Sequence, residues 1–268
     1  MPTRKKSKLG ILAGSGILPA QLVQACQKQS IEPVIIGFKG YTDHVTPDYW
    51  GRIGSSTKIL NYLQENNVRD IVMIGAIKRP SFFDLWPDWA TFKFFLKAWL
   101  KSFGDDGLLK AARYALEARG FQIHGIHEYL PDLLMPEGIL STHPPLEGHQ
   151  IDVQVGIQAA RQLGREDKGQ AVLVKNGQVI AQEDVHGTSV LIQNHGQVGA
   201  ILVKMRKPQQ DKDLDLPTVG PQTVELCAAK QMAGIVGQAQ NTLLVERMQT
   251  IQLANQNGLF VLGVTIDE

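Results

Sequence analysis

The chain has few cysteines, no long apolar run and almost no net charge. Two cysteines among 268 residues, Cys26 and Cys227, are too few for a disulfide framework and favour a reducing compartment. No apolar stretch approaches the length that crosses a bilayer. The formal net charge is +1, whereas domains that coat nucleic acid are usually strongly basic. We therefore expect no nucleic-acid partner.

Familiar catalytic motifs are missing as well. The sequence contains no HExxH and no Cys/His pattern of the kind that binds zinc. It has no GxSxG nucleophile elbow and no P-loop lysine, and neither cysteine stands in a recognisable catalytic setting. Zinc chemistry and covalent catalysis are therefore not expected.

The N-terminal residues superficially resemble a signal peptide, because basic residues precede apolar ones. However, Gly10, Gly14, Gly16 and Pro19 interrupt the apolar stretch. A strand that enters a glycine turn explains this pattern better. We therefore expect mature, cytoplasmic sequence here.

Short apolar runs alternate with helical patterns through the first half of the chain. Strands are predicted at 9–13, 33–37, 70–76 and 121–126, and helices at 19–29, 57–66 and 107–119. This alternation is typical of a parallel sheet with right-handed crossovers. Residues 1–135 are therefore predicted to form an N-terminal Rossmann-like domain.

The composition becomes rich in Pro, Gly and His at 131–150, which predicts a linker over 136–150. Residues 151–268 are predicted to form a second domain. Its helices are expected at 151–163, 222–233 and 248–257, and its strands at 171–174, 179–182, 199–203, 242–245 and 259–264. Asn176-Gly177 predicts a hairpin turn. The predicted fold class is α/β, with a Rossmann-like parallel-sheet domain and a distinct C-terminal α/β domain.

The loop Gly14-Ser15-Gly16 follows a predicted strand and opens a helix. Its N–H groups and the helix dipole could receive a phosphate, and the alternative is a merely tight turn. The dinucleotide fingerprint is incomplete, because Pro19 stands where its third glycine belongs. No acidic residue ends the second strand, so an NAD-dependent oxidoreductase is disfavoured.

Two further pairs of polar residues lie beside predicted elements of the first domain. Lys78 and Arg79 come just after the third strand, at the sheet edge where open α/β sheets bind ligands. They are either phosphate contacts or exposed loop cations. Asp105 and Asp106 precede the next helix and are either N-cap residues or polar site groups.

Residues 82–103 hold nine of the eighteen aromatic residues. Lys93, Lys97 and Lys101 recur every four residues, which makes a basic stripe on a helix. Such a helix could lie on a membrane interface or line an acyl-chain pocket. The alternative is an ordinary helix packed on the sheet.

The segment 204–220 concentrates charge of both signs. Its cations are Lys204, Arg206 and Lys207, and its carboxylates are Asp211, Asp213 and Asp215. Because Pro217 favours an extended backbone before it, the three carboxylates are expected to share one side. Cations beside clustered carboxylates suit a phosphate together with Mg²⁺, and a solvated charged loop is the alternative.

Several stretches in this order resemble a known family. They are Gly10–Pro19, Gly75–Pro80, Gly104–Leu109, Gly120–His127, Gly187-Thr188, Lys204–Gly220, Gly234–Gly237 and Gly258–Val264. Together they resemble the bacterial UDP-2,3-diacylglucosamine pyrophosphatase family of the LpxI type, which acts in lipid A biosynthesis.

The resemblance implies Mg²⁺-dependent hydrolysis of UDP-2,3-diacylglucosamine to 2,3-diacylglucosamine 1-phosphate (lipid X) and UMP, with water attacking the α-phosphorus. It implies that Asp215, in the DLPTVG motif, is critical as a metal ligand or as the group that orients the water. Asp211 is a second candidate ligand. Further candidate substrate contacts in the matching stretches are Thr188, Lys204, Lys207, Gln210 and Thr218. Apart from the resemblance, we expect a peripheral location on the inner membrane, because the aromatic helix could contact the acyl chains or the membrane that carries them, and a homodimer, because closed two-fold assemblies are common.

One departure from the family pattern bears on activity. Where the family usually reads EGTD, this chain has HGTS, residues 186–189, so two carboxylates are missing. Glu183 and Asp184 lie close by in the sequence and could compensate. Glu246 also stands where an aspartate is common. The alternative function is therefore a catalytically silent protein that binds UDP-sugars or nucleotides.

Overall fold

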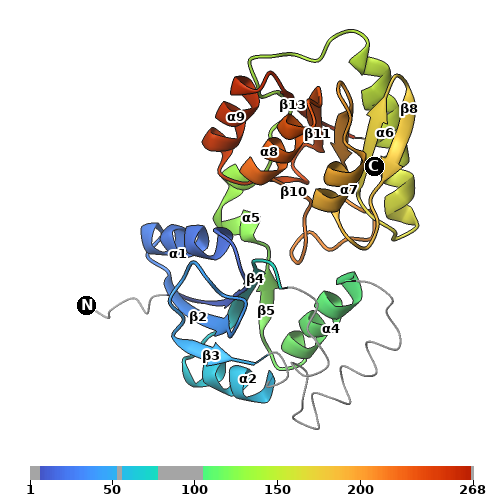
Figure 1. Ribbon diagram of the computed structural model, residues 1–268. Helices are drawn as coiled ribbons and strands as arrows, with labels where there is room; N and C mark the ends of the chain where they lie inside the picture. The colour runs from blue at the N-terminus through green and yellow to red at the C-terminus, as the bar shows by residue number, and fades with distance from the viewer. Residues whose placement is uncertain (1–6, 53–55, 78–104, 267–268) are drawn as a thin grey trace. The chain divides into compact units, whose positions relative to one another are not determined.

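The computed structural model describes residues 7–52, 56–77 and 105–266, and the predicted basic aromatic helix at 82–103 lies outside these ranges. The chain divides into two compact units, the first ending at Pro131 and the second beginning at Asp132. Each unit has its own sheet and its own helices (Figure 1). The predicted α/β class is confirmed.

The first unit is built on a parallel sheet of five strands in the order β3-β2-β1-β4-β5. The strands are β1 (Lys8–Ala13), β2 (Glu32–Phe38), β3 (Tyr49–Gly51), β4 (Asp70–Ile74) and β5 (Gln122–His124). Apolar side chains of β1, β2 and β4 are buried, as expected for a parallel sheet covered on both faces. The Rossmann-like prediction is confirmed.

The helices of this unit connect the strands in the predicted manner. They are α1 (Leu18–Lys28), α2 (Ser56–Glu65), α4 (Asp105–Glu117) and α5 (Ile126–Tyr129). Figure 1 shows α1 on one side of the sheet and α2 on the other. The chain runs outward from β1 to β3 and then returns to add β4 and β5 on the other side of β1. The carboxyl ends of β1 and β4 therefore form a topological switch point, where open α/β sheets bind ligands.

The second unit contains a mixed sheet of six strands in the order β6-β13-β11-β9-β7-β8. Its strands are β6 (Gly138–Ile139), β7 (Ala171–Lys175), β8 (Gln178–Gln182), β9 (Ile201–Lys204), β11 (Gly234–Gln238) and β13 (Phe260–Val264). The central strands β9, β11 and β13 are parallel, while β6, β7 and β8 add antiparallel pairs at the edges. A separate parallel pair joins β10 (Thr218–Val219) to β12 (Leu243–Leu244).

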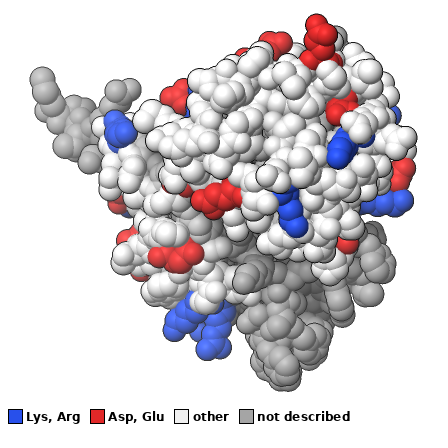
Figure 2. All heavy atoms as spheres, turned by 45° about the horizontal axis from the view of Figure 1, so that its top comes forward, with Lys and Arg blue, Asp and Glu red and all other residues white. Residues whose placement is uncertain are grey.

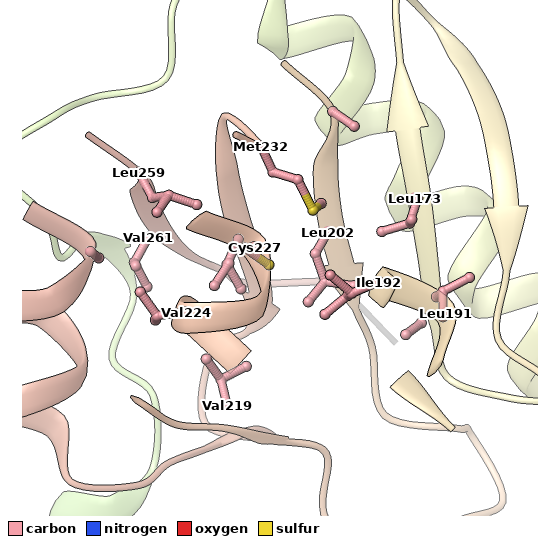
Figure 3. Close-up of a cluster of buried hydrophobic side chains, with 14 of the residues drawn as sticks. Leu173, Leu191, Ile192, Leu202, Val219, Val224, Cys227, Met232, Leu259 and Val261 are labelled. Carbon is pink, nitrogen blue, oxygen red and sulfur yellow. The ribbon is translucent and has the colours of Figure 1, made fainter. Parts of the chain in front are cut away.

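The helices of the second unit cover the two faces of its sheet, and strand alternation decides which side chains they meet. Val172 and Val174 pack with Ala160 and Leu163 of α6 (His149–Arg165). Leu173 and the neighbouring inward residues pack with three other helices, as the close-up in Figure 3 shows. These helices are α7 (Thr188–His195), α8 (Pro221–Ala229) and α9 (Arg247–Gln256).

Residues 136–150, predicted as a linker, lie within this second unit and take part in its sheet. Strand β6 pairs with β13, and Leu140 N donates to Val261 O at 2.8 Å. Met135 is fully buried and its sulfur packs over Gly237. The short edge strand β6 follows the 3-10 turn Pro131–Leu133.

The predicted hairpin forms as expected, because Asn176 and Gly177 both take positive φ and Lys175 pairs with Gln178. None of the helices within the described ranges is long and apolar enough to cross a membrane. On the face shown in Figure 2, Lys and Arg side chains alternate with Asp and Glu among uncharged residues. This mixture agrees with the net charge of +1.

Candidate active site

At the carboxyl end of β9, three residues on neighbouring strands of the second unit lie side by side across the sheet. Lys204, the last residue of β9, is the register partner of Ala171, the first residue of β7. Glu183, directly after β8, donates its N–H to Ala171 O at 2.9 Å. Residues aligned across a sheet point to the same face. Since Ala171 packs in the core beneath α7 and α8, Glu183 and Lys204 are directed to that face too.

Lys204 is a buried cation, with 6% of its surface exposed. Its Nζ donates a hydrogen bond to Thr218 O, at the start of β10, over 3.1 Å. Burial lowers the pKa of Lys204, while the negative charges of Glu183 and Asp215 act to raise it. Burial outweighs these two charges, so the pKa of Lys204 is lowered from its usual value, and the side chain lies in the field of two acidic side chains.

Glu183 is a buried carboxylate, 9% exposed, and each of its oxygens has a donor. Thr188 Oγ1, on the first residue of α7, donates to Oε1 at 2.5 Å. Gln170 N donates to Oε2 at 2.8 Å. The predicted contact Thr188 therefore has its hydroxyl directed to Glu183. Sequence reasoning recognised Glu183 only as a nearby acid, because the pairing of β8, β7 and β9 is not visible in the sequence.

Asp215 is held by Gln210, a residue that is only 3% exposed. Gln210 Nε2 donates to Asp215 Oδ2 at 2.5 Å, and Gln210 Oε1 accepts a hydrogen bond from Lys207 N at 3.3 Å. Gln210 O accepts a further bond from Arg206 Nη1 at 3.0 Å. Gln210 thus forms hydrogen bonds both with the cationic residues of the segment and with Asp215.

The extended backbone predicted for the three aspartates is wrong. Leu214 N and Asp215 N both donate to Asp211 O, at 3.1 and 3.0 Å, so residues 211–215 form a tight turn. Asp213 N also donates to Asp211 Oδ1 at 3.0 Å. Asp side chains readily bond to a backbone N–H two residues on, and this local bonding competes with an extended strand.

The remaining predicted contacts of this segment have other partners. Lys207 Nζ donates to Asp167 Oδ1 at 2.9 Å, beyond the end of α6. Thr218 presents its carbonyl to Lys204, while its hydroxyl donates to Leu216 O at 3.2 Å. Gln238, which the sequence did not single out, ends β11 nearby and accepts Arg206 N at 3.1 Å.

The donor set can be compared with what Mg²⁺ requires. Within the described residues, no group of three or more His, Cys, Asp or Glu side chains could hold a metal ion. A preformed cage is therefore not part of this region. Mg²⁺ commonly binds through one or two carboxylates together with water and substrate phosphates. Asp211 and Asp215 stand at the two ends of one five-residue turn, and two such carboxylates fit that second mode.

The loop Gly14-Ser15-Gly16 lies at the switch point of the first unit, where it pairs with the chain after β4. Gly14 N donates to Ile74 O at 2.8 Å and Ser15 N to Ala76 O at 2.9 Å. Gly16 N donates to the carboxylate of Asp43 at 2.9 Å. All three N–H groups thus have protein acceptors, which is the tight-turn arrangement. A phosphate would have to displace Asp43 to reach Gly16 N.

The other candidates of the first unit are only partly placed. Lys78 and Arg79 lie outside the described residues, directly after Ile77. Asp105 and Asp106 are the first two residues of α4.

Taken together, the fold and the buried lysine near two carboxylates define a two-domain α/β protein with a buried charged centre in its second unit. Comparison with known proteins agrees with this class over nearly the whole chain. The LpxI N-terminal domain model matches residues 8–133, and the LpxI C-terminal domain model matches residues 136–262. The chain therefore belongs to the LpxI family, and the resemblance drawn from its motifs is confirmed.

A curated relative covers almost the same length. UDP-2,3-diacylglucosamine pyrophosphatase LpxI of Caulobacter vibrioides is 32% identical over 276 residues, which span 97% of this chain and 99% of that protein.

Proposed function

We propose that this protein hydrolyses the pyrophosphate bond of UDP-2,3-diacylglucosamine to give UMP and 2,3-diacylglucosamine 1-phosphate in lipid A biosynthesis. The principal support is the full-length match to a relative that carries this activity in its name. The buried Lys204, which the charges of Glu183 and Asp215 reach, supports the same proposal, because its ammonium would offset negative charge on a diphosphate.

In the proposed reaction, a water oxygen attacks the α-phosphorus, and the bond from that phosphorus to the bridging oxygen breaks. The new oxygen stays with UMP, and the bridging oxygen leaves with the lipid 1-phosphate. Asp215, held by Gln210, would orient the water or bind the metal ion. Lys204 would neutralise charge that develops on the diphosphate.

Mg²⁺ is part of the proposal as a cofactor. Asp215 and Asp211 would hold it together with phosphate oxygens of the substrate. When bound, the ion would withdraw charge from the phosphate oxygens as a Lewis acid.

The alternative, a catalytically silent binder of UDP-sugars, was raised by HGTS at residues 186–189. In the structure His186 and Ser189 are both exposed, and His186 N donates to Asp184 Oδ1 at 2.9 Å. The two changed positions are thus exposed, whereas Glu183 is buried and accepts a hydrogen bond from Thr188. This placement favours an active enzyme.

We further propose that the protein acts in the cytoplasm and binds the inner-membrane surface peripherally, because its substrate carries two acyl chains. The support is the basic aromatic pattern of residues 82–103 in the sequence. A homodimer is proposed only on the general frequency of two-fold assemblies.

The test is UMP release by the purified full-length protein from UDP-2,3-diacylglucosamine and Mg²⁺. We expect release that stops on addition of EDTA, returns with excess Mg²⁺ and is absent in Asp215→Ala. Asp132→Asn, an exposed aspartate of the same unit, is the matched control and should remain active. Substrate binding without UMP release would establish the silent binder instead.

A further inference from the structure

The row Glu183–Ala171–Lys204 places an acid and a base on either side of a small residue. Neighbouring strands are about 4.8 Å apart, so the backbones of Glu183 and Lys204 are separated by about 10 Å. The methyl group of Ala171 between them leaves room above the sheet. Two long side chains on one face can therefore approach each other over Ala171.

The position of the Glu183 carboxylate is set by its neighbours before any ligand arrives. Thr188 Oγ1 and Gln170 N each occupy one of its oxygens. Gln170 O in turn accepts Met205 N at 2.9 Å, directly after Lys204. The backbone of Gln170, directly before β7, thus joins the carboxylate to the residue after the lysine, and a shift of one would move the other.

A buried ammonium needs such a counter-charge. Removing an ion from water is costly unless the ion is paired and hydrogen-bonded. Lys204 has three N–H donors, and Thr218 O accepts one of them. Asp215 supplies negative charge from the turn at residues 211–215, where substrate or metal would compete for it. Glu183, fixed on the sheet, does not depend on that competition.

We propose that Glu183 is a positioning residue, which Thr188 holds in place and which keeps the Lys204 ammonium directed at the diphosphate of the substrate. Thr188 then acts through Glu183 and does not contact the substrate. This inference rests on the proposed function. It assigns the role of counter-charge to Lys204 to the carboxylate of Glu183. It also explains why the exposed positions 186 and 189 can lack acidic side chains.

The test compares hydroxyl and methyl at one position in the full-length protein. Thr188→Ser retains the hydroxyl, whereas Thr188→Val replaces it with a methyl group of similar shape. We expect Thr188→Ser to stay within about 3-fold of wild-type kcat, and Thr188→Val to lose about 10-fold in kcat with little change in KM. Glu183→Gln should lose about 100-fold in kcat. Glu183→Gln combined with Thr188→Val should be no slower than Glu183→Gln alone, because both changes remove one interaction.

The controls are Thr142→Val and Glu147→Gln, both exposed residues of the same unit, which should match the wild type. Thermal unfolding of each variant separates a slower enzyme from a smaller folded fraction. The inference is overturned if Thr188→Val and Glu183→Gln are as active as the wild type, if Thr188→Val raises KM alone, or if lost activity follows lost folded protein. A wild-type protein that releases no UMP would instead overturn the proposed function itself.

Discussion

Gln210 Nε2 donates a 2.5 Å hydrogen bond to Asp215 Oδ2, so a buried amide sets the direction of the acid that the proposed reaction needs most. Gln210→Ala should remove this restraint on Asp215 and lower kcat for UMP release about 10- to 100-fold, since misplaced groups lose much of their catalytic effect. Steady-state kinetics measure this change.

Gln209 provides the matched control for Gln210. It is the same residue type one position earlier, and its Nε2 donates to Gly164 O at 2.7 Å. Gln209→Ala should therefore retain kcat. Equal losses in both variants would show that the loop as a whole matters and not the bond to Asp215.

The two lysines of this segment should differ in importance. Lys204 lies buried beside Glu183 and Asp215, whereas Lys207 Nζ is paired with Asp167 at 2.9 Å. Lys204→Met should lower kcat by about 10²- to 10³-fold, the usual cost of removing one group that stabilises developing charge. Lys207→Met should cost less than about 10-fold, as expected for a cation already engaged elsewhere. The reverse order would assign the phosphate contact to Lys207.

A prediction for the membrane concerns Lys93, Lys97 and Lys101. If these lysines attract an anionic bilayer, changing all three to Glu should weaken binding to liposomes that contain anionic lipid. The binding free energy should fall by about 1 kcal/mol for each lysine charge lost, and co-sedimentation with the liposomes measures the change. Binding of the wild type should also weaken as salt is raised. Unchanged liposome binding and unchanged turnover of the acylated substrate would assign residues 82–103 to ordinary packing.

The sequence predicted most of the strands, because their apolar runs are long enough to stand out. It did not predict β11, although this strand lies in the middle of the second sheet. Gly234 and Gly237 interrupt its apolar run, and in the structure the ring of Phe260 and the sulfur of Met135 fill the space over them. Such packing comes from distant parts of the chain and leaves no local signal.

The candidate site shows the same limit. Lys204, Gln210, Asp215 and Thr218 were predicted from one segment, and hydrogen bonds or charge interactions connect them. Glu183 joins them only through the pairing of β8 with β7 and of β7 with β9. A hairpin turn predicts the first pairing, but the second links residues far apart in sequence, which no local pattern indicates.

A stability prediction concerns the switch point of the first unit, where the backbone at Gly14 lies close to the backbone of Gly75 and Ala76. A Cβ on Gly14 would lie 2.7 Å from Ala76 O and from backbone atoms of Gly75. Gly14→Ala should lower the free energy of unfolding by about 3 kcal/mol, since neither backbone segment can move aside easily. Gly40→Ala is the control, because Gly40 has φ +83° and nothing within 4 Å of an added Cβ. It should cost about 1 to 2 kcal/mol, the strain of that backbone region alone.

His124 gives the first unit a pH-dependent contribution to stability. Its ring nitrogens face Asp70 Oδ1 at 2.9 Å and Glu128 Oε2 at 3.1 Å. Burial acts to lower the pKa of His124, but the hydrogen bonds and negative charges of the two acids outweigh it and raise this pKa above the usual 6.5. A raised pKa in the folded state means that the contribution is fully present below pH 6.5 and is lost as the pH rises through the folded value.

The free energy of unfolding of the wild type should therefore exceed that of His124→Gln most at about pH 5.5, and the difference should shrink towards about pH 8.5. All four tryptophans precede residue 104, so tryptophan fluorescence in urea reports on the first unit. His44→Gln is the control, since His44 is more than half exposed and lies 3.9 Å from Asp43. It should reproduce the pH dependence of the wild type. A difference between wild type and His124→Gln that grows with pH would mean that the imidazole is neutral in the folded protein, because only the charged form can donate to both carboxylates at once.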